Sequence, residues 1–414
     1  MKKPRTIKTA KTIKTIFILG VGFVLWVILV VLQQPEVTVF TPEAGSEFAS
    51  TSISVSTDTE VAVVPKPKIR ILIVPGHEPG YGGAQFGNIN ERDLVVELAQ
   101  DLQKFLQTND SYQVFITRDT QSWDPTFADY FKNNTDSIVA WEKAAIKNTD
   151  QLISVGSLAK PVVSIIHIKT ATDPAVRLYG ITKWSNENNI DLMIHVHLND
   201  YPGHSQKTAG EYSGFAIYLP AQHYSNSTTT HAISEDIFKH LAKYNPVSNF
   251  DLEVGGLIDD PELIAVGANN TSKAPSMLIE YSYLYEPQLV NPKTRATVLK
   301  DLAYQTFLGL QDFYGQTDAS APTTASYDTS VLPYVWNNPL PSKGTFADIY
   351  ALQTALESAG FYPPAGETMT TCPRSGVFGT CTWKALFAFQ TKYGITGKDG
   401  STEKKTLDAL NAKF

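Results

Sequence analysis

The stretch ILIVPGHEPGYGGAQFG, residues 71–87, decides the fold of this chain. It opens with the apolar run of a strand expected over residues 69–74, and that run leads into Pro75-Gly76-His77. An amphipathic helix follows, with Asn90 as its expected N-cap. Its apolar face consists of Leu94, Val95, Leu98, Leu102, Phe105 and Leu106. A strand followed directly by a helix of this kind is typical of an α/β domain.

The alternation of strand-like and helix-like stretches continues to about residue 315. Further strands are expected at 113–117, 192–197, 214–219 and 276–280. This order predicts an α/β fold, a twisted and mostly parallel sheet flanked by helices, in a domain over residues 67–316. A polar linker is expected at 317–343, and a small, mainly helical domain at 344–414.

The whole chain of 414 residues has room for about three structural units at roughly 150 residues each. Its 34 Lys and Arg and 41 Asp and Glu give a formal charge of −7. Residues 1–14 hold six basic residues and no acidic one, so the rest of the chain carries −13. A body this acidic repels phosphate backbones, which argues against a nucleic-acid partner. Two cysteines are too few for a disulfide-built scaffold or a zinc ribbon.

Residues 16–32 (IFILGVGFVLWVILVVL) are uncharged and almost wholly apolar. As a helix they would span about 26 Å, near the lower limit for crossing a bilayer. The basic residues before this run predict a cytoplasmic tail at 1–14, a transmembrane helix at 15–33 and a tether at 34–66 on the extracytoplasmic side. A cleaved secretory signal is the alternative, but its apolar run is usually only about 7 to 15 residues long.

Four polar side chains are expected at one edge of the sheet. His77 follows the first strand, and Glu91 opens the next helix. His197 and Glu280 each end a later strand, and functional crevices of open α/β sheets lie beyond the carboxyl ends of the strands. Two imidazoles and one carboxylate match a catalytic zinc site. We therefore predict one Zn²⁺ ion held by the two histidines and Glu91, with Glu280 moving protons.

Each of these residues also has an ordinary structural explanation. A histidine after a strand is usually a surface or turn residue, and the helix dipole favours a glutamate such as Glu91 in any first turn. His195 and His197 point to the same side of one strand, and His195 is expected to be the structural member of the pair. Glu280 is harder to explain this way, because a carboxylate after the apolar run 277–279 is costly to bury without a partner.

The order of these segments resembles that of the zinc-dependent N-acetylmuramoyl-L-alanine amidases. The similar segments are 71–87, Asn90–Leu94, Ile116–Arg118, His195–Asn199, Gly214–Leu219 and Ala274–Glu280. The resemblance covers about residues 69–315 and implies zinc bound by His77, Glu91 and His197, with Glu280 as the catalytic residue. It implies a peptidoglycan substrate, cut at the amide between N-acetylmuramic acid and L-alanine. Asn199, in the same motif as His197, is expected to bind substrate.

The chain departs from the amidase pattern at several positions. Val74 replaces the usual Asp, His195 replaces a Ser, Glu78-Pro79 replaces a Gly pair, and Ser282 replaces a Gly. These changes leave the expected metal ligands intact. They are expected to affect the shape of the loop after His77 and the details of substrate recognition. The segment 123–183 is longer than the family core requires, and we expect a lid or a regulatory insertion there. Its aromatic residues include Trp123, Phe127, Tyr130 and Trp141.

Residues 346–414 resemble a three-helix peptidoglycan-binding domain. The similar segments include Leu352-Gln353, Gly360-Phe361, Gly376–Gly379, Ala385–Gln390 and Thr406-Leu407. Cys372 and Cys381 flank the turn 376–379, and in an oxidising compartment they are expected to form a disulfide. The alternative is a pair of buried free thiols.

These features together predict a membrane-anchored, exported cell-wall hydrolase, with peptidoglycan and the membrane as its partners and no nucleic acid. One alternative is a non-catalytic wall-binding protein on an amidase fold, although degenerate copies tend to lose metal ligands first. Another is a different zinc peptidase that uses His195 and His197 as paired ligands, which would leave Glu91 without a ligand role.

Overall fold

The computed structural model describes residues 67–160, 172–315, 328–395, 400 and 402–414. The predicted cytoplasmic tail, transmembrane helix and tether all lie outside the described residues. Among the helices that are described, none is both long enough and apolar enough to cross a membrane.

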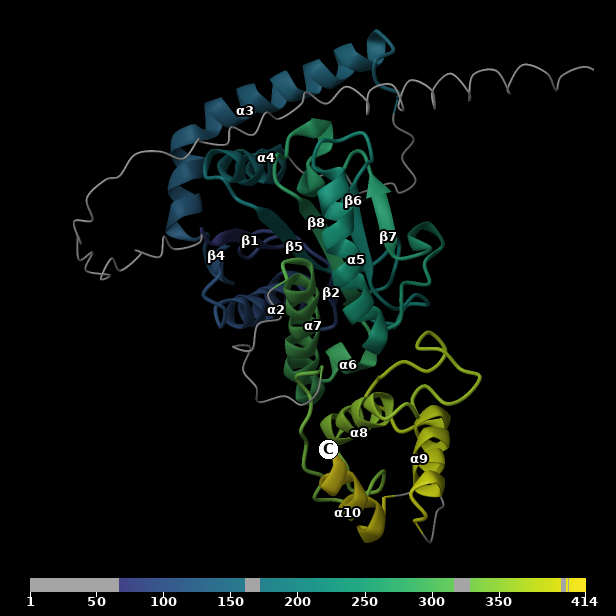
Figure 1. The fold of residues 1–414 in the computed structure, drawn as a ribbon. Coiled ribbons are helices and arrows are strands. Elements are labelled where there is room, and N and C mark those ends of the chain that lie inside the picture. The colour runs from purple at the N-terminus through teal and green to yellow at the C-terminus, as the bar shows by residue number, and fades with distance from the viewer. Residues whose placement is uncertain (1–66, 161–171, 316–327, 396–399, 401) are drawn as a thin grey trace, which may run out of the picture. The chain divides into compact units, whose positions relative to one another are not determined.

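A six-stranded sheet with the order β4-β1-β5-β8-β6-β7 forms the centre of the larger domain (Figure 1). Its strands are β1 (Ile69–Pro75), β4 (Tyr112–Ile116), β5 (Leu192–Asn199), β6 (Ala216–Pro220), β7 (Leu257–Asp260) and β8 (Ser276–Tyr283). All neighbouring strands are parallel except β6 and β8, which are antiparallel, so the sheet is mixed. Sequence periodicity did not indicate β7, which is short and ends in two aspartates.

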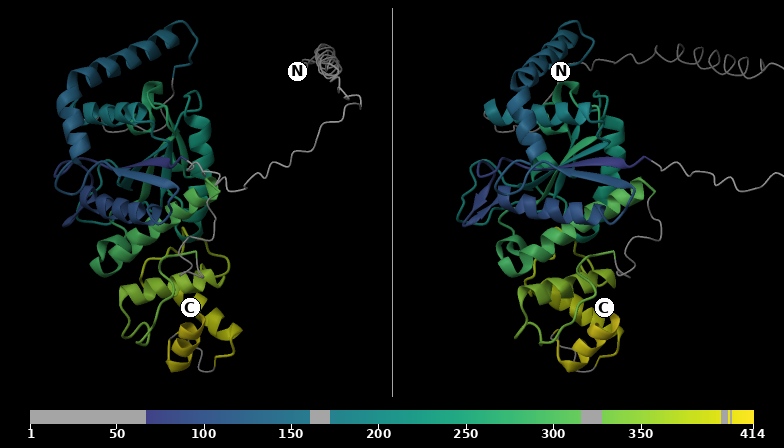
Figure 2. Two further views of the ribbon diagram at one scale, coloured as in Figure 1. Left: turned by 60° about the vertical axis from the view of Figure 1, so that its left-hand side comes forward. Right: turned by 90° about the vertical axis from the view of Figure 1, so that its left-hand side faces the viewer.

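Helices cover both faces of the sheet, as predicted (Figure 2). The side chains of β1 alternate between two apolar clusters: Ile71 and Ile73 belong to one, Leu72 and Val74 to the other. The first cluster lies under α2 (Glu91–Leu106), α5 (Ser227–Tyr244) and α7 (Pro292–Phe313). The second lies under α3 (Pro125–Ser154) and α4 (Thr172–Glu187). The remaining short elements are β2 (Gln85–Phe86), β3 (Ile89–Asn90), η1 (Asp251–Glu253), η2 (Ile264–Val266), η3 (Ala268–Asn270) and α6 (Pro287–Val290).

The segment 123–183, expected to be a lid or regulatory insertion, contributes α3 and most of α4. Phe127 is buried in the second cluster, where its ring centroid lies 4.7 Å from that of Trp184. Trp123, Tyr130 and Trp141 are partly buried against the same cluster. These aromatic residues therefore help to cover one face of the sheet. Residues 161–171 lie outside the described residues, and the lid function stays a prediction.

The C-terminal region contains three helices, α8 (Phe346–Ser358), α9 (Thr380–Lys392) and α10 (Lys404–Lys413). Their core includes the fully buried Leu352, Phe389 and Leu410. Trp336 and Leu340 pack into the same core, and the Trp336 Nε1 donates a hydrogen bond to the Asp348 carbonyl at 2.9 Å. The carboxyl part of the predicted linker 317–343 is therefore packed, because its apolar side chains complete this core.

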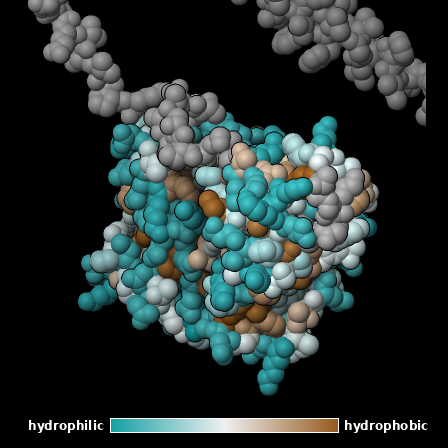
Figure 3. Space-filling view, turned by 90° about the horizontal axis from the view of Figure 1, so that it is seen from below, coloured by the Kyte–Doolittle hydropathy of each residue, from teal (hydrophilic) through white to brown (hydrophobic). Residues whose placement is uncertain are grey.

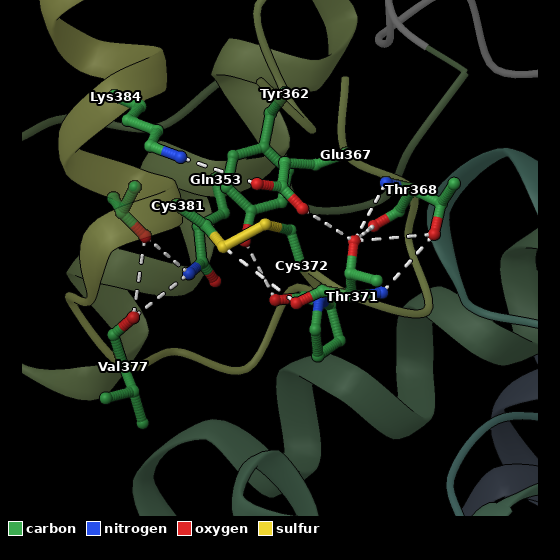
Figure 4. The surroundings of a disulfide bond; sticks show 11 residues. Gln353, Tyr362, Glu367, Thr368, Thr371, Cys372, Val377, Cys381 and Lys384 are labelled. Atoms are coloured by element: carbon green, nitrogen blue, oxygen red, sulfur yellow. Dashed lines mark hydrogen bonds and ion pairs between the residues drawn. A yellow bond between two sulfur atoms is a disulfide. The ribbon is translucent and has the colours of Figure 1, made fainter. Parts of the chain in front are cut away.

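A disulfide joins Cys372 and Cys381, whose Cα atoms are 5.8 Å apart (Figure 4). Hydrogen bonds around it tie the loop between α8 and α9 to α8. Gln353 on α8 donates to the Val377 carbonyl at 3.2 Å and to the Thr382 hydroxyl at 2.9 Å. The carboxyl end of the loop that carries the disulfide is thus held against α8.

A buried cluster, called here the Arg374 junction, links this loop to α5 and α7. The Arg374 guanidinium donates to Asp301 at 3.1 Å, to the Tyr244 carbonyl at 2.9 Å and to the Thr354 hydroxyl at 2.7 Å. It also stacks against the Tyr244 and Tyr350 rings, 4.6 and 4.8 Å from their centroids. Asp301 accepts further hydrogen bonds from Thr329 and Ser330. Each of the two buried charges therefore has several partners.

The surface seen in Figure 3 is mostly hydrophilic, and its hydrophobic residues form separate patches. In the C-terminal region the large hydrophobic side chains exposed to solvent are Val335, Phe346, Val377, Trp383 and Tyr393. Scattered hydrophobic side chains of this kind are normal on a surface in contact with water.

Candidate metal centre

Three side chains converge at the carboxyl ends of β1 and β5. His77, Glu91 and His197 each offer a ligand atom, and these atoms lie within 4.8 Å of one another. The His77 Nε2 is 2.8 Å from the Glu91 Oε2, and the His197 Nδ1 is 3.0 Å from the Glu91 Oε1. Residues far apart in the sequence therefore meet at the edge where the strand order places them.

The Pro-Gly-His turn brings His77 back towards β5. The Gly76 N–H donates to the Val196 carbonyl at 2.8 Å, and His77 adopts a left-handed backbone conformation with φ of 66°. A Cβ atom on residue 76 would lie 2.3 Å from the His197 ring. Glycine is therefore required here, because the His197 ring lies directly against its Cα.

Arg118 holds this turn against the start of α2. Its buried guanidinium donates to the carbonyls of Pro75 at 3.2 Å, of Arg92 at 3.0 Å, and of Gly76. One side chain thus fixes the backbone on both sides of the site, next to His77 and next to Glu91. Arg118 lies in the segment Ile116–Arg118, which resembles the amidases, but the sequence alone did not predict a function for this residue.

Glu91 is fixed by backbone donors as well as by the two imidazoles. The Ala84 N–H donates to its Oε2 at 2.8 Å, and the Leu198 N–H donates to its Oε1 at 3.1 Å. Burial raises the pKa of Glu91, but the charge of His77 and the hydrogen bonds of both histidines outweigh burial and bring this pKa well below its usual value. Asn90 occupies the N-cap position of α2 as predicted, yet its side chain donates to Asp93.

His197 is held in its neutral form. Burial lowers its pKa, and the opposing effect of Glu91 does not restore the usual value. A neutral imidazole is the form that binds a metal ion. Together with the ionised Glu91, it provides the donor types that zinc prefers.

Glu280 lies beside His197, because the two residues are direct Cα partners between the parallel strands β5 and β8. Its Oε2 atom is buried and has no hydrogen-bond partner among the described residues. Burial raises the pKa of Glu280 well above its usual value, and the nearby charges of Glu91 and Glu253 raise it further. A carboxylate whose pKa is raised is a stronger base than an ordinary one, so it is suited to accept a proton and then release it.

Two of the departures from the amidase pattern lie next to each other. Val74 and His195 are Cα partners between β1 and β5. His195 is buried, and neither of its ring nitrogens has a hydrogen-bond partner in the part of the chain that is described. Burial, assisted by His197, lowers its pKa to about 3. His195 is therefore a neutral core residue outside the three-residue group, as the sequence suggested.

The residues present fit a divalent cation. Glu91, Glu280 and Glu253 place three carboxyl groups in or beside the site, while the nearby Arg118 donates to backbone carbonyls. A bound dication would balance this excess of negative charge. The two histidines and Glu91 are the residues that would hold it.

Asn199, expected to bind substrate, ends β5 and is buried. Its Nδ2 donates to both carboxylate oxygens of Glu253, at 2.8 and 3.1 Å. Glu253 was not among the predicted site residues. It lies in η1, in a polar stretch without strand or helix periodicity, and no signal in the sequence would have placed it here.

Comparison with known families agrees with this geometry. Residues 71–312, more than half of the chain, match the model of the N-acetylmuramoyl-L-alanine amidase family. Residues 347–410 match that of a peptidoglycan binding domain. No curated protein matches the chain.

Several solved structures resemble the larger domain. The CwlD amidase from Clostridioides difficile, in complex with the GerS lipoprotein, is 15% identical with a TM-score of 0.40, over 60% of this chain and all of that one. The N-acetylmuramyl-L-alanine amidase Ami1 from Mycobacterium smegmatis is 14% identical with a TM-score of 0.39, over 60% of this chain and 98% of that one. Cwp6 from Clostridium difficile is 18% identical with a TM-score of 0.38, over 60% of this chain and 29% of that one.

Proposed function

Because this chain belongs to the N-acetylmuramoyl-L-alanine amidase family and carries a peptidoglycan-binding domain, we propose that it is a zinc-dependent, membrane-anchored cell-wall hydrolase. Its substrate is the amide bond between N-acetylmuramic acid and the L-alanine of the stem peptide. The observation that carries the zinc assignment is the convergence of His77, Glu91 and His197 within 4.8 Å.

A zinc ion held by these residues would act as a Lewis acid and lower the pKa of a water molecule to about 7. The protein's own contribution begins with Glu91, whose two oxygens are fixed by backbone N–H groups of Ala84 and Leu198. Arg118 holds the backbone turn that precedes His77, because its guanidinium donates to the carbonyls of Pro75 and Gly76. Outer partners of this kind orient metal ligands before substrate arrives.

Glu280 is the proton-transfer residue in this proposal. Hydrolysis adds water across the amide: a C–O bond forms, the C–N bond breaks, and the leaving nitrogen gains a proton. The Glu280 carboxyl takes a proton from the attacking water and gives one to that nitrogen. Two features suit it to this role: its position beside His197, and a buried oxygen atom with no partner among the described residues.

The C-terminal domain would keep the enzyme on its substrate. A binding module joined to a catalytic module raises the local concentration of the wall polymer at the active site without tight affinity for any single chain. This role requires no residue of the metal centre, so the two functions can be separated by mutation.

The N-terminal part of the proposal rests on the sequence. The apolar run 16–32 would anchor the protein, and the six basic residues before it would keep residues 1–14 in the cytoplasm. The catalytic domain would then face the cell wall, an oxidising location that suits the disulfide between Cys372 and Cys381.

Digestion of purified sacculi by the full chain tests the activity. We expect new amino-terminal L-alanine on the stem peptides, and we expect a chelator to abolish their release and added zinc to restore it. Release of any other new terminus would contradict the amidase assignment. Binding to sacculi without any cleavage would favour the non-catalytic alternative.

A further inference from the structure

A second buried carboxylate, Glu253, lies behind the metal centre. It is 1% exposed and accepts hydrogen bonds from four side chains. The Tyr218 hydroxyl on β6 donates at 2.7 Å and the Tyr283 hydroxyl on β8 at 3.2 Å. Ser248 also donates, and so does Asn199 on β5. One carboxylate therefore connects the carboxyl ends of β5 and β8 with β6, and all four donors are uncharged.

A charged group in this position needs an explanation beyond packing. Burial of a carboxylate is costly unless hydrogen bonds replace the lost water, and here hydroxyl and amide groups do so without a cation. The one partner that approaches both carboxylate oxygens is Asn199, which follows the proposed ligand His197 by two residues. The pairing of β5 with β8 shifts register between His197 and Asn199. Val196 and Leu198 nevertheless both face the first apolar cluster, so the side chains of His197 and Asn199 point to the other side of β5.

The contact with Glu253 determines which way the Asn199 amide is turned. An ionised carboxylate only accepts hydrogen bonds, so the NH₂ group of Asn199 must face Glu253. Its Oδ1 then faces away, and in the described part of the chain no side chain or backbone group donates to this oxygen. The Oδ1 atom is therefore an oriented acceptor at the end of β5, two residues after His197.

We propose that Glu253 is a positioning residue that turns the Asn199 carboxamide so that its Oδ1 accepts an amide N–H of the peptidoglycan substrate next to the bond that is cleaved. This inference rests on the proposed amidase function and deepens it. Glu253 acts only through Asn199 and touches neither the substrate nor the metal ligands. An acceptor fixed in this way selects an amide over an ester at the same position, because an ester has no N–H to donate.

A double-mutant cycle tests this inference. Glu253→Gln keeps the size of the side chain, but its NH₂ group competes with that of Asn199 for acceptors. We expect Glu253→Gln and Asn199→Ala each to lower kcat/KM for a muramyl peptide by at least tenfold. We expect the double variant to be no slower than the slower single variant, because both changes remove the same oriented acceptor. Additive losses, or no loss in either single variant, would overturn the proposal.

Two controls separate positioning from folding. Ser248→Ala removes one donor to Glu253 and leaves its contact with Asn199 intact, so we expect nearly wild-type kcat/KM. Zinc content should be unchanged in Asn199→Ala, while the thermal midpoint should fall, because Glu253 loses the donor that contacts both of its oxygens. If Glu253→Gln fails to fold, Asn199→Asp replaces it, because repulsion between the two carboxylates should displace the whole side chain at position 199 together with its acceptor oxygens. Full activity of the Asp variant would then overturn the proposal.

Binding distinguishes this inference from a failure of the proposed function. If the wild-type chain cleaves no muramyl peptide, the amidase proposal fails, and the affinity of the full chain for the intact muramyl peptide is measured instead. The inference still requires Asn199→Ala and Glu253→Gln to weaken that binding by a similar, non-additive factor. Equal affinity in all variants would overturn it.

Discussion

The candidate metal centre and the Arg374 junction both bury charged side chains, but these side chains differ in how well their hydrogen-bonding groups are satisfied. At the junction, Arg374 contacts Asp301, two oxygen acceptors and two aromatic rings, and Asp301 has further donors. At the metal centre, the buried Oε2 of Glu280 has no partner among the described residues, and three carboxyl groups crowd the site. Satisfied buried charges are typical of structure, whereas unsatisfied ones point to a ligand or a reaction.

This difference predicts opposite responses to the same kind of mutation. Removing the Glu280 carboxyl from the candidate metal centre should reduce activity with little loss of stability, because its buried oxygen has no partner among the described residues. Removing a charge from the junction should reduce stability with little direct effect on catalysis, because partners are left unpaired.

The largest expected effect is the loss of activity in Glu280→Gln. Proton transfer by a positioned side chain contributes about 10²- to 10⁴-fold to a rate, so we expect a decrease in kcat of that order. The thermal midpoint should stay the same or rise, because an unpaired buried carboxyl becomes a neutral amide. Turnover of a muramyl peptide and thermal melts measure the two quantities. Glu235→Gln on α5, which replaces an exposed glutamate, is the matched control and should be neutral in both.

The second prediction concerns metal content. Glu91→Ala should lose most of the bound zinc after dialysis, because it removes the residue that contacts both histidines. His195→Ser should keep close to one zinc per chain, because His195 lies outside the three-residue group. Elemental analysis of the purified proteins measures both. If His195→Ser loses zinc and Glu91→Ala retains it, the result would instead support the alternative in which His195 and His197 are paired zinc ligands.

The sequence was sufficient to predict which residues meet at the candidate metal centre because each of them begins or ends a predicted helix or strand, although each signal alone is weak. His197 and Glu280 end apolar runs, and the carboxyl ends of parallel strands meet at one edge of a sheet. The order of these segments along the chain then indicated one family, the amidases. Short edge elements such as β7 gave no comparable signal, since four residues with two aspartates show no clear alternation.

Residues that act through distant partners could not be predicted. Glu253 lies in a polar 3₁₀ turn, and its four donors come from segments up to 54 residues away. Arg374 and Asp301 are 73 residues apart, and a single charged residue in a sequence is normally expected at the surface. Only the tertiary structure shows that these charges are buried and which groups satisfy them.

The third prediction tests the junction. Arg374→Met leaves Asp301 buried without its cation, and breaking such a pair typically costs about 3 to 5 kcal/mol. We expect a loss of that order in the free energy of unfolding, measured by denaturant titration. Arg374→Met combined with Asp301→Asn should recover part of the loss, because the second change removes the unpaired charge. Zinc content should be unchanged in both variants. A double variant no more stable than Arg374→Met would show that the ion pair is not the source of the loss.

The smallest expected effect comes from Glu357 on α8, whose charge interacts with that of Arg374. Its Oε2 is buried without a partner among the described residues, and burial raises its pKa to about 7, against the opposing charges of Arg374 and Lys243. Between pH 4.5 and 7 the folded state therefore binds more protons at this residue than the unfolded state, and stability falls as the pH rises through this window.

Glu357→Gln should remove this part of the pH dependence. We expect the variant to match the wild type near pH 4.5 and to exceed it at pH 8 by on the order of 1 to 2 kcal/mol, allowing for partial exposure of the side chain to solvent. Denaturant titrations of both proteins at several pH values measure the difference. Because Glu357 lies outside the metal centre, its unsatisfied oxygen should affect stability alone, with kcat/KM unchanged. A change in kcat/KM would contradict the proposed division, in which charges near the Arg374 junction affect stability and those at the candidate metal centre affect activity.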